Sequence, residues 1–115
     1  MTDSAIKYQA DYADAYNTKG CVLYIKEDYP DAIIAFQKAT ELNPNLTMAH
    51  KNAGMAYINL KQYDRALPYL EKANELDPND SQTIYFLAVT SQNTGDTAKA
   101  REYFNQVEQM KKNGQ

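Results

Sequence analysis

The side chains best suited to chemistry in this sequence are a single histidine, His50, and a single cysteine, Cys21. A zinc site needs about four ligands, and a cysteine nucleophile needs a base and a third group that orients it. The sequence pattern suggests no such partners for either residue. The carboxylates Glu41, Glu71 and Glu75 fall where a solvated helix face is expected. We therefore expect no catalytic centre, metal or cofactor, and a packed or half-exposed ring at His50.

Composition narrows the class of protein further. The chain has 115 residues, 43% of them apolar, and a formal net charge of −3, which suits one folded domain. The charges are interspersed, so no basic stripe indicates nucleic acid, and no apolar run is long enough to span a membrane. A single cysteine forms no disulfide within the chain, which favours the cytoplasm. A chain that had lost a signal or an anchor would look the same.

The elements that position these residues follow from an internal repeat. The pentapeptides ELNPN at 41–45 and ELDPN at 75–79 lie 34 residues apart, and the same register continues without gaps through most of the chain. It defines three units: 13–46, 47–80 and 81–114. The columns that match, or nearly match, in all three units are Gly20, Gly54 and Ala88; Ala32, Ala66 and Ala100; Phe36, Leu70 and Phe104; and Ala39, Ala73 and Val107.

Each unit has the pattern of two helices, because apolar residues recur at i, i+3 and i+4 and no stretch alternates as a strand would. Pro44 and Pro78 predict that a helix ends just before each of them. Pro30 suits a helix start, and Gly95 suits a left-handed cap. In the middle unit we expect a polar break at 61–64 and a second helix over 65–76, which tolerates Pro68 about one turn in.

Small residues predict close helix pairing. Gly20 and Gly54 fall midway along the first helices, although glycine inside a helix costs about 1 kcal/mol relative to alanine. Two glycines at equivalent sites therefore indicate that the partner helix approaches the backbone closely there.

The two ends differ from the repeat. Residues 1–12 precede the first unit, and we expect them to extend the first helix backwards toward Ser4, with a disordered leader as the alternative. At the other end Lys112 stands where a third proline would be, so the last helix can continue. Its polar outer side suits the end of an array; excision from a longer protein and pairing with a second copy are the alternatives.

These columns, together with Tyr16 and Tyr57, resemble the tetratricopeptide repeat (TPR) family over residues 13–114. The resemblance implies an all-α fold: a right-handed superhelical α-solenoid of antiparallel helix pairs, with the first helices lining a concave inner groove. It also implies a non-enzymatic protein- or peptide-binding scaffold. An array filled by its own terminus or by another copy, as a structural or self-assembly segment, is the second hypothesis.

The resemblance also places an apolar and aromatic strip with a few amides in that groove, where it would bind an amphipathic helix or an extended peptide. The alternative is that part of this set packs between repeats. The predicted groove residues are Asn17, Cys21, Tyr24, Lys51, Asn52, Met55, Ile58, Tyr85, Phe86 and Val89.

One TPR sub-family is disfavoured. TPR cochaperones that hold acidic chaperone tails use a two-carboxylate clamp of paired lysine, asparagine and arginine side chains. The corresponding residues here are Asn17 and Cys21, then Asn52, then Gln82 and Phe86, of which only Asn52 matches. Without paired cations the carboxylates of such a tail would have no charge-assisted partners. The partner is thus expected to be a protein or peptide of another kind, bound by a monomer or weak homo-oligomer.

Overall fold

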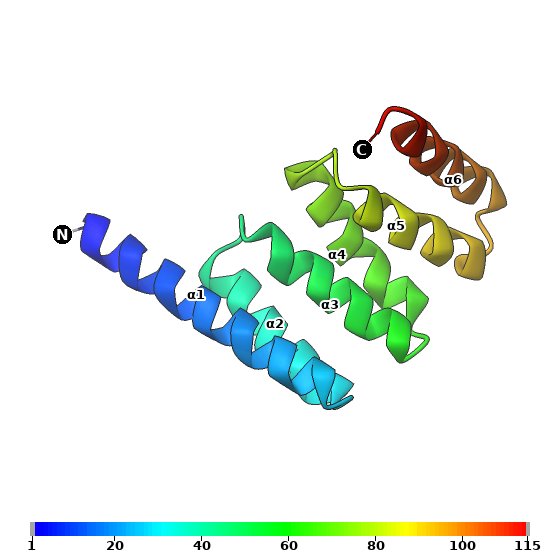
Figure 1. Cartoon of the computed structure of the whole chain (residues 1–115). Coiled ribbons are helices and arrows are strands. Elements are labelled where there is room, and N and C mark those ends of the chain that lie inside the picture. Colours follow the sequence, from blue (N-terminus) through cyan, green and yellow to red (C-terminus); the bar gives the residue numbers. More distant parts are fainter. Residues whose placement is uncertain (1, 115) are drawn as a thin grey trace.

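The computed structural model describes the backbone of residues 2–114 and the side chains of residues 11–114. The described chain is six helices joined by short turns (Figure 1). The helices are α1 (Thr2–Ile25), α2 (Tyr29–Leu42), α3 (Thr47–Asn59), α4 (Tyr63–Leu76), α5 (Ser81–Thr94) and α6 (Thr97–Lys112).

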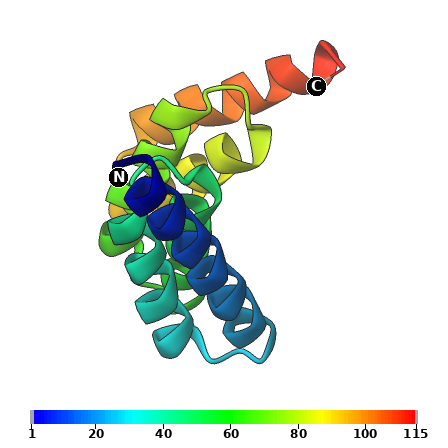
Figure 2. The same ribbon diagram turned by 90° about the vertical axis from the view of Figure 1, so that its left-hand side faces the viewer.

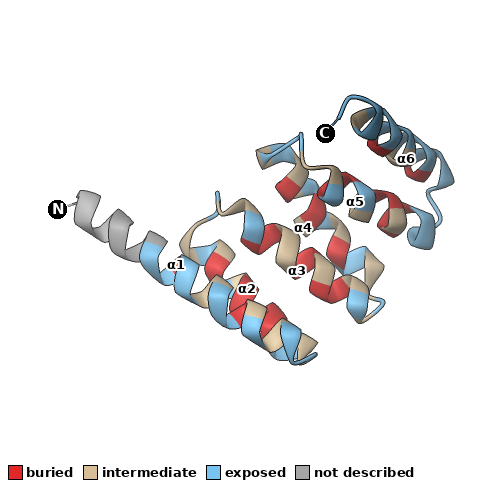
Figure 3. Ribbon diagram, in the orientation of Figure 1, coloured by how far each residue is buried: buried red, intermediate tan, exposed pale blue. Residues whose placement is uncertain are grey.

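Helices pair within each unit and the pairs stack, as the expected all-α solenoid requires. The first helices of the units, α1, α3 and α5, run side by side in Figure 1, and the second helices, α2, α4 and α6, pack against them. The stack is elongated, about 47 × 30 × 21 Å, and its two ends lie apart in both Figure 1 and Figure 2. Figure 3 shows buried positions along the packed faces of the pairs, whereas α6 is largely exposed.

Glycine lets the paired helices touch, as the repeat predicted. A methyl group added to Gly20 would lie 2.5 Å from Phe36, and one added to Gly54 would lie 2.6 Å from Leu70. The side chains of Phe36 and Leu70 are almost fully buried against these glycines. The backbone gap left by glycine is therefore filled by the bulky residue sixteen positions later, which fixes the spacing of the first two pairs.

The turns confirm most of the expected helix ends. Helices α2 and α4 end at Leu42 and Leu76, just ahead of the two prolines, and Gly95 caps α5 with a φ of 93°. Helix α4 continues through Pro68, and α6 runs two residues beyond the register of its counterparts.

Two helices, α1 and α4, begin earlier in the chain than the sequence pattern predicts. Helix α4 begins at Tyr63 rather than at residue 65, because the carbonyl of Gln62 accepts the amides of Arg65 and Ala66 and Asp64 lies in the first turn. An acidic residue there is favoured by the helix dipole. Helix α1 begins at Thr2, so residues 2–12, which the sequence pattern assigned to an extension, are a continuous part of it.

Candidate functional site

The face formed by α1, α3 and α5, called here the first-helix face, is held together by side-chain bonds between neighbouring helices. The amide of Asn52 on α3 donates to Oδ1 of Asn17 on α1 at 3.0 Å. Two turns further along, the amide of Asn59 donates to the hydroxyl of Tyr24 at 2.6 Å. These two bridges fix the register of α1 against α3.

A small pocket of about 200 Å³, called here the α1–α3 pocket, opens on this face. Its wall includes Asn52, from the first of these bridges, and Tyr24, from the second. Phe36 reaches the pocket from α2. Ile25 stands beside it with 80% of its side chain exposed. The full lining is Cys21, Tyr24, Ile25, Phe36, Asn52 and Met55.

An ion pair connects α3 to α5 on the next part of the face. Nζ of Lys51 lies 2.9 Å from Oδ2 of Asp80, which also accepts from the hydroxyl of Thr83 and, through Oδ1, from the backbone amide of Gln82. Burial raises the pKa of Asp80, but the bonds from Lys51 and Thr83 and the charge of Lys51 outweigh burial and leave this pKa below its ordinary value. The carboxylate is thus both the cap of α5 and the counter-ion of the only groove lysine that the sequence predicted.

Aromatic rings gather at the third unit. Tyr85 is 48% exposed, and its ring lies 6.0 Å from that of Phe86 and 6.1 Å from that of Phe104, both edge-on. Such edge-to-face pairs stabilise one another beyond their buried area. The exposed ring of Tyr85 therefore packs against two other rings, one on α5 and one on α6.

The predicted groove residues divide into two groups in the structure. Cys21, Tyr24, Asn52 and Met55 meet around the α1–α3 pocket, and Asn17 is bonded to Asn52 at its edge. The remaining predicted residues are Lys51, paired with Asp80; Tyr85, exposed; Val89, half-buried; and Ile58 and Phe86, which pack in part against the hydrophobic core.

Reasoning from sequence missed two residues that shape this face, Asn59 and Asp80. Asn59 is four residues beyond Met55 and seven beyond Asn52, so its helical spacing alone could have placed it on the same face. Asp80 had no such signal, because it is 29 residues from Lys51 and the two meet only through the stacking of one unit on the next.

The cysteine and the histidine are not arranged for catalysis. Burial raises the pKa of the Cys21 thiol, so the thiol is protonated near neutral pH and is a poor nucleophile. His50 is buried, its Nε2 donates to the carbonyl of Pro44 at 2.8 Å, and its ring lies 6.2 Å from that of Tyr69. Residues 11–114 contain no cluster of three side chains that could hold a metal ion. The packed ring expected at His50 is confirmed.

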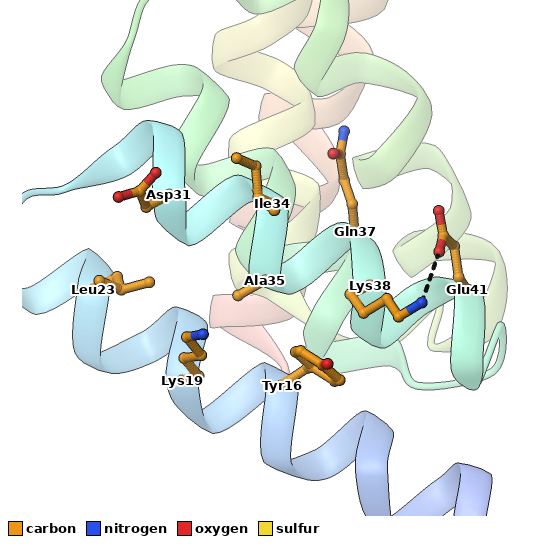
Figure 4. Close-up of a pocket in the computed structure, with 9 residues that line it drawn as sticks. All are labelled: Tyr16, Lys19, Leu23, Asp31, Ile34, Ala35, Gln37, Lys38 and Glu41. Carbon is orange, nitrogen blue, oxygen red and sulfur yellow. Dashed lines mark ion pairs between the residues drawn. The ribbon is translucent and has the colours of Figure 1, made fainter.

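A larger cavity of about 520 Å³ lies elsewhere, between α1 and α2 (Figure 4). Lys19 and Leu23 line it from α1, opposite Ile34 and the Lys38–Glu41 ion pair on α2. One unit later, the counterparts of Lys19 and Leu23 are Ala53 and Tyr57, both buried, and Gln37 of α2 donates to the Tyr57 hydroxyl at 3.1 Å. The cavity therefore lies on an end face of the stack. Inside the stack, a neighbouring helix pair covers the equivalent face. Charged side chains of both signs surround the cavity.

Three models of known protein families match this chain. Family models of the tetratricopeptide repeat match residues 13–46, 35–67 and 58–113, and together they extend over residues 13–113. The chain belongs to the tetratricopeptide repeat family, as the repeat pattern indicated.

Curated relatives are longer than this chain. The peroxisomal targeting signal receptor of Saccharomyces cerevisiae is 30% identical over 91 residues, which are 79% of this chain and 15% of the receptor. The uncharacterized protein ycf37 of Guillardia theta is 31% identical over 104 residues, 86% of this chain and 58% of that protein. The chain therefore spans 58% or less of the length of these two relatives.

Solved structures have the same fold. The second TPR domain of Spaghetti (RPAP3), bound to the HSP90 peptide SRMEEVD, superposes with a TM-score of 0.88 at 19% identity over 93% of this chain and 98% of that one. YrrB, described as a TPR protein with an unusual peptide-binding site, gives 0.79 at 30% identity over 85% and 50%. MamA gives 0.83 at 22% identity over 89% and 60%. At 22% identity or less, MamA and Spaghetti carry an argument about fold alone.

No described helix is both long and apolar enough to cross a lipid bilayer.

Proposed function

We propose that this chain is a non-enzymatic scaffold that binds a protein or peptide partner in a groove formed by its first-helix face. The observation that carries the proposal is the α1–α3 pocket: it is apolar, it opens on this face, and four of the predicted groove residues line it. Exposed apolar surface at such a position marks an interaction site.

A second observation supports the same surface. Tyr85 is exposed on the first-helix face although it is a large aromatic residue, and two rings hold it in place. Aromatic side chains that are rigid and partly exposed are typical anchors of protein interfaces. The relationship to YrrB, whose structure is described by its peptide-binding site, supports a peptide partner.

The test is selection of binders from a random peptide display library, followed by affinity measurements on the double variant Met55→Ala/Tyr85→Ala. We expect the double variant to keep its helical content and to lose most of its affinity, because both anchors contact the bound peptide. The matched control is Ile34→Ala, which removes an exposed aliphatic side chain from α2, beside the other cavity. Unchanged affinity in the double variant, or equal loss in the control, would rule out this groove.

A further inference from the structure

A cavity of about 450 Å³, called here the α6 cleft, lies between α6 and the turn that joins α4 to α5. That turn and α6 lie side by side in both Figure 1 and Figure 2. No residue that lines the α6 cleft also lines the α1–α3 pocket. Its volume falls within the range of ligand-binding clefts, about 300–1,000 Å³. The α6 cleft is therefore a candidate site separate from the first-helix face.

The α6 cleft lacks a hydrogen bond that its counterpart one unit earlier makes. Pro78 and Ile84, which line the cleft, occupy the positions of Pro44 and His50 in the repeat. At the earlier junction Nε2 of His50 donates to the carbonyl of Pro44 at 2.8 Å. Ile84 has no side-chain donor, and within residues 11–114 no other group donates to the carbonyl of Pro78. This carbonyl can therefore accept a bond from a bound group.

The charge around the α6 cleft favours a cation. Glu102 is the only ionisable residue that lines it, and this side chain is exposed. Pro78 and Asn79 follow the C-terminal end of α4, which has no basic residue in its last turn. The C-terminal end of a helix carries partial negative charge and is stabilised by a nearby cation. A ligand with a positive charge is thus favoured over a neutral or an acidic one.

The polar groups and the apolar surface of the α6 cleft together match an arginine side chain. Besides Glu102 and the carbonyl of Pro78, four carboxamides supply acceptor oxygens: Asn79, Asn105, Gln106 and Gln109. A guanidinium presents five N–H donors in one plane and accepts no bond, whereas the ammonium of lysine is a compact point charge. Ile84 and Met110 add apolar surface along which the methylene groups of an arginine can pack.

We propose that a partner protein inserts one arginine side chain into the α6 cleft. Its guanidinium pairs with the carboxylate of Glu102 and donates to the carbonyl of Pro78, and its methylene groups pack on Ile84 and Met110. This interaction surface is additional to the groove proposed above and does not depend on it.

The probes are nonapeptides with a fixed central arginine, selected from a display library in which constant sequence flanks both ends. The bait is Met55→Ala/Tyr85→Ala, so that peptides for the first-helix face are not enriched. Selected peptides are synthesised with an acetyl and an amide end, each also with citrulline, which has nearly the same shape as arginine but no charge. Affinities are measured on the wild type and on Glu102→Gln. The matched control is Glu108→Gln, at an exposed glutamate of α6 that does not line the cleft.

We expect the citrulline peptides to bind about five- to tenfold more weakly than the arginine peptides. Glu102→Gln should weaken binding of the arginine peptides by about three- to fivefold, and Glu108→Gln by less than about twofold. Ile84→His, which supplies to Pro78 the donor that His50 supplies to Pro44, should weaken binding by about fivefold. If Ile84→His does not fold, the carbonyl resonance of Pro78 in the isotope-labelled wild type replaces it: binding should shift this resonance, and an unmoved resonance overturns the proposal.

The outcomes separate this inference from the proposed groove. Equal affinity of the arginine and citrulline peptides, or wild-type affinity of Glu102→Gln, overturns the inference. Failure to select any peptide that depends on Glu102 overturns it as well. None of these results bears on peptides selected with the wild type that lose affinity in Met55→Ala/Tyr85→Ala, since those peptides test the groove alone.

Discussion

At the scale of single residues, the Asp80 side chain accepts hydrogen bonds from three residues, more than any other side chain in residues 11–114. Its side chain caps α5 through Gln82 and Thr83 and pairs with Lys51 across the junction of the second and third units. The equivalent position one unit earlier is Leu46, which makes no side-chain cap. Asp80 therefore adds to the second junction an electrostatic link that the first junction lacks.

Asp80→Asn should lower the free energy of unfolding by about 1 kcal/mol at pH 7, because the ion pair is lost while the amide oxygen can still cap the helix. The pKa of Asp80 is lower in the folded protein than in an unfolded chain. The stability that it contributes is thus present above the unfolded pKa, about 3.9, and is lost as the pH falls through the folded value.

Urea denaturation at several pH values between neutral and strongly acid measures both effects. The wild type should lose more stability than Asp80→Asn over the acid part of the range, so the two curves should converge there. Asn105→Ala, at an exposed position of α6, is the control and should leave the pH dependence unchanged, because it removes no ionisable group. Parallel curves for wild type and Asp80→Asn would show that the ion pair is not linked to folding.

At the scale of the helices, the same turn recurs after α1, α3 and α5. Glu27, Lys61 and Gly95 are 34 residues apart, and all three have positive φ angles, of 64°, 60° and 93°. The left-handed conformation closes the C-terminal end of a helix and is cheap only for glycine. Two of the three turns therefore place a residue with a Cβ where the backbone favours glycine.

Lys61→Gly should raise the free energy of unfolding by about 0.5–1 kcal/mol, because relief of the left-handed strain exceeds the extra entropy of glycine in the unfolded chain. Lys61→Ala removes the same exposed side chain but retains a Cβ, so it should give no such gain. Urea denaturation of the two variants decides the matter: equal stabilities would mean that the turn carries no strain.

The helices could be predicted well from the sequence, because residues within the units themselves mark where helices end and where they pair. Pro44 and Pro78 stop α2 and α4, and Gly20 and Gly54 fix where the pairs touch. The left-handed turns at Glu27 and Lys61 lie in the same register as the one at Gly95. Only Gly95 has a residue type that indicates a left-handed turn, so the other two could have been predicted only from the repeat.

The contacts of the candidate site were harder to predict from the sequence, because its geometry depends on how one unit stacks on the next. The amide pair Asn17–Asn52 joins two units, and the ion pair Lys51–Asp80 joins α3 to the start of α5. The small offset between stacked helices decides which side chains meet, and no periodicity within one helix records that offset. The sequence thus identified residues of the first-helix face but not their bonds.

At the scale of the whole molecule, the two ends of the stack differ from its interior junctions. On the side that faces the preceding unit, Ala53 and Leu87 are fully buried, and the first unit has Lys19 at that position. On the side that faces the following unit, Ile33 is buried and Leu67 is half-buried, and the last unit has the exposed Arg101. Each end therefore carries a cation where the junctions inside the stack bury an apolar side chain.

This difference bears on self-association. Head-to-tail stacking of two copies would repeat the interior junction, and it would desolvate Lys19 of one copy and Arg101 of the other. Burial of unpaired charge is costly, so we expect the chain with these residues to stay monomeric over a wide range of concentrations.

The double variant Lys19→Ala/Arg101→Leu restores the interior residue types at both ends and should associate head to tail as its concentration rises. Sedimentation velocity over a concentration series measures this, with Lys61→Ala/Lys99→Leu as a control that removes two other cations from exposed positions. Association of the double variant alone would assign the two end cations the role of blocking head-to-tail stacking. Association of the wild type, by contrast, would contradict the argument and favour self-assembly as the use of these end faces.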